Sequence, residues 1–309
     1  MAGCIHIKRI YELAAPEDGL RILVDRQWPQ GVSRAQAPLW IREAAPSDAL
    51  RKWYESGEGD FIAFRERYLQ ELRQKADAAF VYTMEKSLKE EDVTLLYAAE
   101  DPVQNNAAVL AEWLERRLAD RNRIREEKKV LRRAIRAKGG TLDRSYREEA
   151  NRRIRERVLS SEIWQQAPSV FVFVSVWDEP DTYALLEEAL RSGKAVYVPR
   201  MYPGRIMKAV RINSLDELQP GTMGIPEPVS DRETAGTGGL SLALIPCVTA
   251  ARDGRRMGHG VGYYDRFLVD RRCRKVCLCY EELLSEDVPM DAHDIPMDAV
   301  VTEREIYRR

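Results

Sequence analysis

The sequence has little histidine, little cysteine and no long apolar segment. Its three histidines, His6, His259 and His293, are too few to assemble a multi-histidine metal centre readily. Its five cysteines are too few and too unevenly spaced for a disulfide framework, which favours a reducing compartment. Cys277 and Cys279 lie in the apolar segment VCLCY, where we expect buried strand positions rather than a zinc site. The chemistry must therefore rest mainly on other groups.

No apolar run approaches the roughly 20 residues that a membrane-spanning helix needs. The N-terminal residues MAGCIHIKRIYEL lack the apolar core and cleavage site of a secretion leader. Hydrophobic residues at 44% and charged residues at 32% are ordinary for a globular protein. We therefore expect a cytoplasmic protein without a membrane partner.

The length of 309 residues predicts two domains, because domains commonly contain about 100 to 200 residues. We place them at residues 1–120 and 121–309, with a boundary near RNRIREEKK, where the sequence becomes polar. No Gly/Ser linker is present there, so helices on either side can run almost continuously.

Charge is unevenly distributed, although the net charge is only -1. Residues 121–159 contain 15 Lys and Arg against 6 Asp and Glu, a local balance of +9. This excess is typical either of an anion-binding region or of solvated helices with basic outer faces. Taken alone, the excess favours solvated helices.

The first domain begins with the strand-like segments CIHIKRIY and LRILVD and returns to a strand at VTLLYAA. Between and after them the spacing predicts helices. Residues 106–118 place Val109, Leu110, Trp113 and Leu114 on one apolar face.

In the second domain, two basic helices separated by Gly139 and Gly140 precede an alternation of strands and helices. Ser145 and Glu148 resemble a capping box that opens the second of these helices. The expected strands are SVFVFVS, KAVYVPR, LALIPCV, VCLCY and DAVVT, with helices at 181–193 and 263–272. We therefore predict two α/β domains, the second being a sheet flanked by helices with a basic helical N-terminal region.

The most informative segment is LALIPCVTAARDGRRMGHGVGYYDRFL, in which a strand leads through a glycine-rich loop into a helix. Glycines let backbone amides approach an anion, and the following helix adds its positive N-terminal end. The loop matches neither the dinucleotide fingerprint nor the P-loop. An ordinary strand-to-helix turn is the alternative explanation of its glycines.

The run GRRMGHGVGYYDR is similar to the hallmark motif of 5-formyltetrahydrofolate cyclo-ligases, also called methenyltetrahydrofolate synthetases. Other segments resemble that family in the same order, namely KKVLR, VSVWDEPDT, the strand ending in VPR, RIMKAVRI, GIPEP, TGGLSLALIP and HDIPMDAVVTE. The resemblance covers roughly residues 122–305. Residues 5–118 resemble the YeaO-like family of unknown function through VDRQWPQGVS, APSDALRKWY and VTLLYAAEDPVQNNAAVL.

The resemblance implies an ATP- and Mg²⁺-dependent enzyme that converts 5-formyltetrahydrofolate to 5,10-methenyltetrahydrofolate, ADP and phosphate. It implies catalytic roles for Lys128, Arg256 and Tyr264. It implies ATP contacts at Lys128, Lys129, Val130, Leu131, Arg132, Arg256, Met257, Gly258, His259, Gly260, Val261, Gly262, Tyr263 and Tyr264. Folate contacts are implied at Val174, Glu179, Met207 and Glu227, and magnesium ligands at Asp265 and Asp294.

The residues themselves allow less specific roles. Lys128 and Arg132 are four residues apart, so on a helix they share one side, which suits a triphosphate but also suits solvent. Asp265 could simply favour a helix N-terminus, and Met207 could simply fill the core.

Ala251 and Ser241 stand where many family members carry acidic residues, and Val261 replaces a basic residue found in some members. These departures motivate a second hypothesis, a folate- or nucleotide-binding module without catalysis. A third hypothesis, nucleic-acid binding through the basic helices, ranks well behind the enzyme. No protein partner is indicated.

Overall fold

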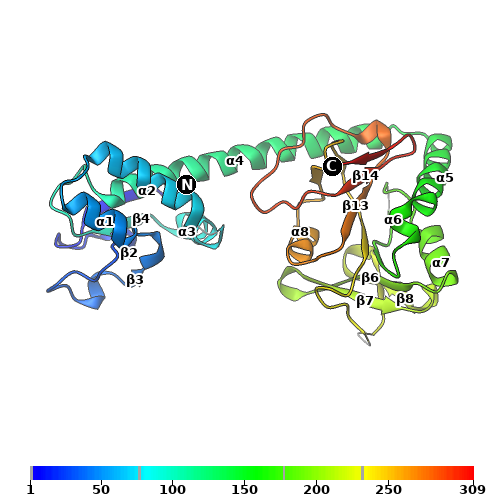
Figure 1. Ribbon diagram of the computed structural model, residues 1–309, viewed down its shortest axis with the longest axis horizontal. Helices are drawn as coiled ribbons and strands as arrows, with labels where there is room; N and C mark the ends of the chain where they lie inside the picture. The colour runs from blue at the N-terminus through cyan, green and yellow to red at the C-terminus, as the bar shows by residue number, and fades with distance from the viewer. Residues whose placement is uncertain (1–2, 76–77, 177, 231–232) are drawn as a thin grey trace. The chain divides into compact units, whose positions relative to one another are not determined.

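The computed structural model describes residues 3–75, 78–176, 178–230 and 233–309. The chain forms two compact units, residues 1–123 and 124–309 (Figure 1). Each unit contains its own sheet with helices packed against it, so the predicted α/β class is confirmed. In the described residues, no helix has both the length and the apolar character that crossing a membrane requires.

The first unit is built on a parallel four-stranded sheet with the order β1-β4-β2-β3. Its strands are β1 (Ile5–Arg9), β2 (Leu20–Leu23), β3 (Leu39–Trp40) and β4 (Val93–Tyr97). Its helices are α1 (Asp48–Glu55), α2 (Phe61–Lys75), α3 (Ala78–Glu90) and the beginning of α4 (Asn106–Gly139), with 3-10 turns at Pro16–Asp18, Arg34–Gln36 and Arg42–Ala44.

Helix α4 is the longest element, with 34 residues. Asn105 stands before it, and its side-chain oxygen accepts a hydrogen bond of 2.8 Å from the amide of Ala108. The predicted apolar face is buried at Val109, Leu110, Trp113 and Leu114. The helix runs on past residue 123, where the two units are divided, so the expectation of continuous helix in place of a linker is confirmed.

The polar residues after β2 have structural partners. Asp25 accepts hydrogen bonds from the amide of Ala98 over 2.8 Å and from the side chain of Asn106 over 3.0 Å. Burial raises the pKa of Asp25. The guanidinium of Arg34 lies 3.9 Å from the ring centroid of Trp28. These contacts tie the end of β2 to β4 and to the start of α4.

The second unit is built on a seven-stranded sheet with the order β15-β14-β13-β10-β5-β6-β7. The five inner strands are parallel, and the two edge strands β15 and β7 are antiparallel to their neighbours. The strands are β5 (Ser169–Val172), β6 (Ala195–Tyr202), β7 (Ile206–Ile212), β10 (Leu242–Ile245), β13 (Arg274–Leu278), β14 (Ala299–Val301) and β15 (Ile306–Arg308). Two small ribbons pair β8 (Leu218–Pro220) with β9 (Pro226–Pro228) and β11 (Thr249–Ala250) with β12 (Arg256–Met257).

Helices cover both sides of this sheet. Figure 1 shows α5 (Arg144–Ser160), α6 (Glu162–Gln165) and α7 (Tyr183–Arg191) on one side and α8 (Tyr263–Leu268) on the other. Four 3-10 turns lie at Pro203–Arg205, Leu215–Glu217, Thr222–Gly224 and Glu281–Leu283. The predicted core face of α5 is buried at Ala150, Ile154 and Val158, and Cys277 and Cys279 are buried as expected.

The capping box predicted at Ser145 is wrong. Helix α5 begins at Arg144, and its cap is Asp143, which accepts a hydrogen bond of 2.7 Å from the amide of Tyr146. Asp caps as well as Ser does, and the hydroxyl of Ser145 instead donates to the same Asp143 carboxylate over 2.7 Å.

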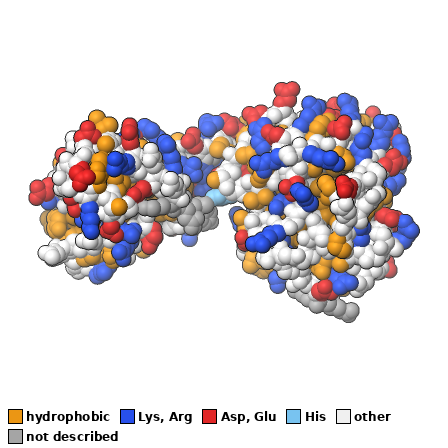
Figure 2. Space-filling view, viewed as in Figure 1, with side chains coloured by type: hydrophobic (Ala, Val, Ile, Leu, Met, Phe, Trp, Pro, Cys, Tyr) orange, Lys and Arg blue, Asp and Glu red, His pale blue; other side chains and the backbone are white. Residues whose placement is uncertain are grey.

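The basic region separates into two kinds of side chain. On α5, arginines pair with glutamates one turn away, as in Arg144 with Glu148 and Arg152 with Glu149 and Glu156. Figure 2 shows basic and acidic side chains interspersed over this unit. The second kind lies on the second half of α4, where several basic side chains line a cavity.

Candidate functional site

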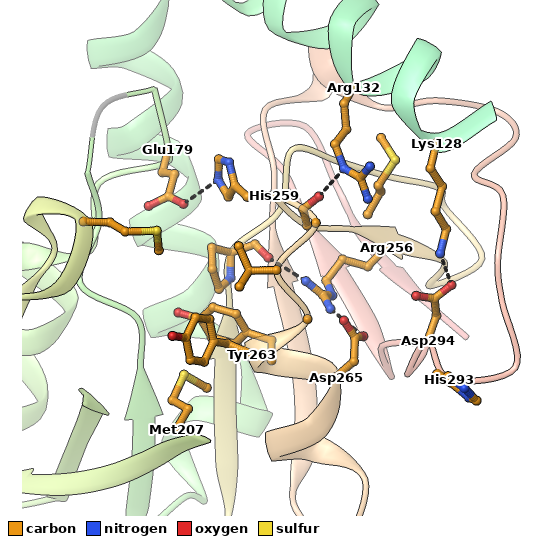
Figure 3. Close-up of a pocket in the computed structure, with 18 of the residues that line it drawn as sticks. Lys128, Arg132, Glu179, Met207, Arg256, His259, Tyr263, Asp265, His293 and Asp294 are labelled. Atoms are coloured by element: carbon orange, nitrogen blue, oxygen red, sulfur yellow. Dashed lines mark hydrogen bonds and ion pairs between the residues drawn. The ribbon is translucent and has the colours of Figure 1, made fainter. Parts of the chain in front are cut away.

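The candidate site lies at the edge of the second unit's sheet, where two neighbouring strands lead to helices on opposite faces of the sheet. Strand β5 leads through α7 to β6, whereas the neighbouring β10 leads through α8 to β13 on the other side. Ligands of open α/β sheets bind in the crevice that such diverging loops create. A cavity of about 720 Å³ lies here, lined by Val174 and Val176 after β5 and by Pro246 after β10 (Figure 3).

One wall of the cavity is a row of cations on α4. Lys128, Arg132 and Arg136 are spaced four residues apart, and all three line the cavity. Lys128 pairs with Asp294, and Nε of Arg132 donates a hydrogen bond of 2.8 Å to the carbonyl oxygen of Gly258. Burial and the positive charge of Arg136 lower the pKa of Arg132. Cations gathered in this way in a half-buried place favour a bound anion.

The glycine loop lies against this row. Gly260 and Gly262 have φ values of 102° and 78°, a region that residues with side chains rarely adopt. A Cβ atom at Gly260 would lie 3.3 Å from Cζ of Arg132, so the loop approaches the arginine closely because it has no side chain there. Helix α8 begins directly after the loop but has only six residues, so its dipole adds little to the field at the loop.

Arg256 and Asp265 form a buried ion pair beneath the loop. Arg256 is 3% exposed, and its Nη2 donates to Oδ1 of Asp265 over 2.7 Å. Its Nη1 donates to the carbonyl oxygen of Pro246 over 3.3 Å. Burial lowers the pKa of Arg256, but the Asp265 carboxylate together with Cys277 and Cys247 raises the pKa overall. The Arg256 Nε group is buried without a partner in the described residues. Arg256 therefore links β12 to α8, and its Nε–H group remains able to donate a hydrogen bond to a further acceptor.

The two carboxylates expected to bind magnesium both have protein partners. Asp265 also accepts a hydrogen bond of 3.2 Å from the amide of Ile295, and Asp294 pairs with Lys128. No cluster of three or more His, Cys, Asp or Glu side chains suited to a metal ion occurs within the described ranges. Magnesium commonly takes only one or two carboxylates and completes its shell with water and phosphate oxygens, so this donor set fits magnesium only together with a phosphate ligand.

Glu179 marks the opposite end of the cavity. Its side chain is 10% exposed, its Oε2 accepts a hydrogen bond of 3.1 Å from the amide of Val176, and its Oε1 lies 3.3 Å from Nε2 of His259. Val174 and Met207 are buried and line the same cavity. Burial, with the charge of Glu179, raises the pKa of Tyr264, so its hydroxyl stays neutral near pH 7. This end of the cavity offers one carboxylate among apolar and aromatic side chains.

Three of the expected site residues do not line the cavity. Val130 is 67% exposed, and Leu131 packs against the core. Glu227 is buried in the β8–β9 ribbon, where its carboxylate accepts hydrogen bonds from the amides of Thr222 over 2.9 Å and Met201 over 3.3 Å. All the other expected residues line the cavity.

Arg136 and His293 also line the cavity, although the sequence motifs did not single out Arg136 and gave His293 no role. The signal for Arg136 was present, because the four-residue spacing from Lys128 to Arg132 continues to it. His293 lies in the long loop before β14 and begins the family-like segment HDIPMDAVVTE, in which only Asp294 was given a role.

Comparison with known proteins matches the two units of the chain to two different families. Residues 124–303 match the model of the 5-formyltetrahydrofolate cyclo-ligase family, and residues 4–131 match the model described as the inactive DUF488-N3 subclade. The 5-formyltetrahydrofolate cyclo-ligase of Escherichia coli K12 is 30% identical over 179 residues, which cover 56% of this chain and 98% of that protein. The uncharacterized protein YeaO of the same organism is 42% identical over 112 residues, which cover 36% of this chain and 96% of YeaO.

A solved structure extends the similarity to the fold. The NMR structure of 5,10-methenyltetrahydrofolate synthetase from Aquifex aeolicus is 29% identical and superimposes with a TM-score of 0.54, covering 59% of this chain and 92% of that one. The matched part corresponds in extent to the second unit, which holds the cavity. The chain belongs to the 5-formyltetrahydrofolate cyclo-ligase family and carries a YeaO-like region in front of its cyclo-ligase region.

Proposed function

We propose that the second unit catalyses the ATP-dependent cyclisation of 5-formyltetrahydrofolate to 5,10-methenyltetrahydrofolate, with release of ADP and phosphate. The observation that carries the proposal is the composition of one cavity. Lys128 and Arg132 line one end, and Glu179 lies at the other, where His259 of the glycine loop reaches it (Figure 3). The first end suits a triphosphate, and the second suits a pterin ring that donates N–H groups.

In this proposal, the formyl oxygen on nitrogen 5 attacks the γ-phosphorus, and the bond between that phosphorus and the oxygen of ADP breaks. Nitrogen 10 then attacks the activated formyl carbon and loses its proton, and the phosphate leaves with the former formyl oxygen and takes up that proton. The protein need not form a covalent bond. Its task is to align the two reactants and to offset the charge on the transferred phosphoryl group.

Each wall has a role in that alignment. Lys128 and Arg132 bind phosphate oxygens together with the loop amides from Gly258 to Gly262. Arg256 and Asp265 hold the loop against the sheet through their 2.7 Å ion pair. Glu179 accepts hydrogen bonds from the pterin, and the neutral hydroxyl of Tyr264 is available as a donor.

Magnesium, when bound, would offset part of the negative charge of the phosphate groups. We propose Asp294 and Asp265 as its carboxylate ligands. Asp294 is the more available of the two, because its partner Lys128 can turn to the phosphates. Asp265 would have to serve the buried Arg256 at the same time.

Absorbance in the methenyl-folate band tests the proposal when the full chain is mixed with 5-formyltetrahydrofolate, ATP and magnesium. We expect the band to grow with the wild-type chain and to grow at least about tenfold more slowly with Lys128→Met. Arg133→Met is the matched control, since it removes an exposed cation on the same helix that does not line the cavity. No growth with the wild-type chain, or equal loss in both variants, would refute the assignment.

The alternative is a module that binds folate or nucleotide without turnover. Its motivation was the replacement of acidic family residues at Ser241 and Ala251. Neither residue lines the cavity, and the Ser241 hydroxyl lies 3.1 Å from that of Ser169 on the neighbouring strand. Because neither residue lies at the cavity, their replacement is weak support for a module without turnover. Binding of both ligands without growth of the methenyl-folate band would instead favour such a module.

A further inference from the structure

A second cavity of about 340 Å³ adjoins the first. Arg136, Glu179 and His259 line both cavities. Nδ1 of His259 lies 3.3 Å from Nη2 of Arg136, and its Nε2 lies 3.3 Å from Oε1 of Glu179. These three side chains, from α4, the glycine loop and the loop after β5, form the boundary between the cavities.

The second cavity suits an uncharged ring rather than a phosphate. Ile135, Val248 and Leu283 give it apolar walls, and Lys128 and Arg132 line only the first cavity. The carboxylates on its wall already have partners. Asp178 pairs with Arg147 over 2.9 Å, and Glu179 pairs with His259.

Arg136 is the cation that remains for a ligand. Across the described parts of the chain, no carboxylate forms an ion pair with it, and the histidine beside it is its hydrogen-bond partner. An anionic group is therefore favoured at the boundary, next to an apolar space.

The size of the first cavity also points to a second compartment. A volume of about 720 Å³ lies within the range of roughly 300 to 1,000 Å³ that typically takes one drug-sized ligand. The proposed reaction brings together two such molecules, ATP and a reduced folate. A compartment that adjoins the first cavity gives room for part of one of them.

The row of cations indicates which molecule extends. Figure 3 shows Lys128 and Asp294 at one end of the cavity, and Glu179 with His259 at the other. The triphosphate belongs to the first end and the pterin to the second, where the boundary with the second cavity lies. The part of the folate that continues from the pterin is an aminobenzoyl ring followed by a glutamate.

We propose that the second cavity binds the aminobenzoyl ring of the folate and that Arg136 binds a carboxylate of its glutamate. This inference rests on the proposed function of the same site. Adenine is the other flat ring in the reaction, and the experiment distinguishes the two.

Gly139→Leu is the variant that tests the cavity. Gly139 lines it at the end of α4, and a Cβ atom there would meet only Leu283 Cδ1 at 3.7 Å and Cδ2 at 4.0 Å. A leucine therefore fits the backbone and fills the cavity, and it is a better helix former than glycine. Gly140→Ala is the matched control, because residue 140 is exposed and does not line either cavity. Thermal unfolding of both variants establishes that they are folded.

Calorimetric titration of the full chain with three probes then follows. The probes are 5-formyltetrahydrofolate, a 5-formyltetrahydropterin that lacks the aminobenzoylglutamate, and ATP. We expect Gly139→Leu to raise the Kd of 5-formyltetrahydrofolate by about tenfold or more, and to leave the Kd values of the pterin and of ATP unchanged. Gly140→Ala should change none of the three.

Arg136→Met tests the carboxylate separately. It should weaken binding of 5-formyltetrahydrofolate more than binding of 5-formyltetrahydropteroate, which lacks the glutamate. An unchanged Kd for 5-formyltetrahydrofolate in Gly139→Leu, or a raised Kd for ATP alone, would overturn the inference. Failure of the wild-type chain to bind any folate would instead overturn the proposed function, and the inference with it.

Discussion

Replacing Asp265 by alanine should unfold the second unit at a much lower temperature than replacing Asp294. Arg256 is 3% exposed, and Asp265 is the carboxylate that pairs with it. Removal of Asp265 leaves a buried guanidinium without its countercharge, which typically costs about 3 to 5 kcal/mol of unfolding free energy. For a unit of this size, roughly 2 to 4 °C per kcal/mol predicts a fall in Tm of about 6 to 20 °C.

Asp294→Ala is the matched variant, because Asp294 is the other expected magnesium ligand and also pairs with a cation. The side chains of Lys128 and Asp294 are 12% and 17% exposed, so the freed ammonium can reach water. We expect this variant to lose less stability than Asp265→Ala, because the Lys128 ammonium lines the cavity whereas the Arg256 guanidinium is almost fully buried.

Scanning calorimetry of the full chain without ligands provides the measurement, and the transition of the first unit serves as an internal reference. The double variant Arg256→Met with Asp265→Leu should recover most of the loss, because it removes both charges from the interior. Equal losses in the two single variants, or a loss below about 1 kcal/mol in Asp265→Ala, would refute the reasoning. The result also decides whether Asp265→Ala can serve as a test of magnesium binding at all.

Three further predictions follow from the same contacts. Arg132→Met should weaken ATP binding by about tenfold or more while leaving the free energy of unfolding unchanged or higher, because burial and Arg136 already disfavour its charge; a parallel fall in urea-measured stability would contradict this. Gly260→Ala should also weaken ATP binding, because the new Cβ lies 3.3 Å from Cζ of Arg132 at a φ of 102°, whereas Gly236→Ala, with open space around it, should not; calorimetric titration of both variants decides. Burial raises the pKa of Tyr280 to about 12 from 10.0, so its contribution to stability is complete below pH 10 and is lost as pH rises through about 12. An unfolding free energy that falls as steeply between pH 10 and 12 in Tyr280→Phe as in the wild-type chain would be inconsistent with this.

The sequence contained enough information to locate most of the candidate site. The glycines of the loop and the four-residue spacing of Lys128 and Arg132 are local patterns, and both lie at the cavity. Buried segments such as VCLCY and LALIP also became strands, because continuous apolar runs are typical of inner parallel strands.

What the sequence did not reveal depends on the conformation of the backbone in loops and at helix ends. The folate contact expected at Glu227 stays a prediction, because the sequence did not reveal that its carboxylate accepts hydrogen bonds from the amides of Thr222 and Met201. The pairing of Arg256 with Asp265 depends on how tightly the loop folds back. The cap of α5 was misplaced because Asp143 and Ser145 are both good capping residues, and only the backbone conformation distinguishes them.

The length of helix α4 affects how the segment that carries Lys128, Arg132 and Arg136 becomes helical during folding. Forming the first turn of a helix is the unfavourable step, and adding residues to an existing helix is easy. The first turns of α4 belong to the YeaO-like region, where Asn105 caps them and Leu110 and Leu114 are buried. Lys128 therefore lies in the interior of a helix that is already nucleated upstream. A chain cut at residue 124 would place Lys128 near a fraying end, among amides that lack partners. The YeaO-like region thus supplies the helix nucleus from which the proposed phosphate-binding residues extend.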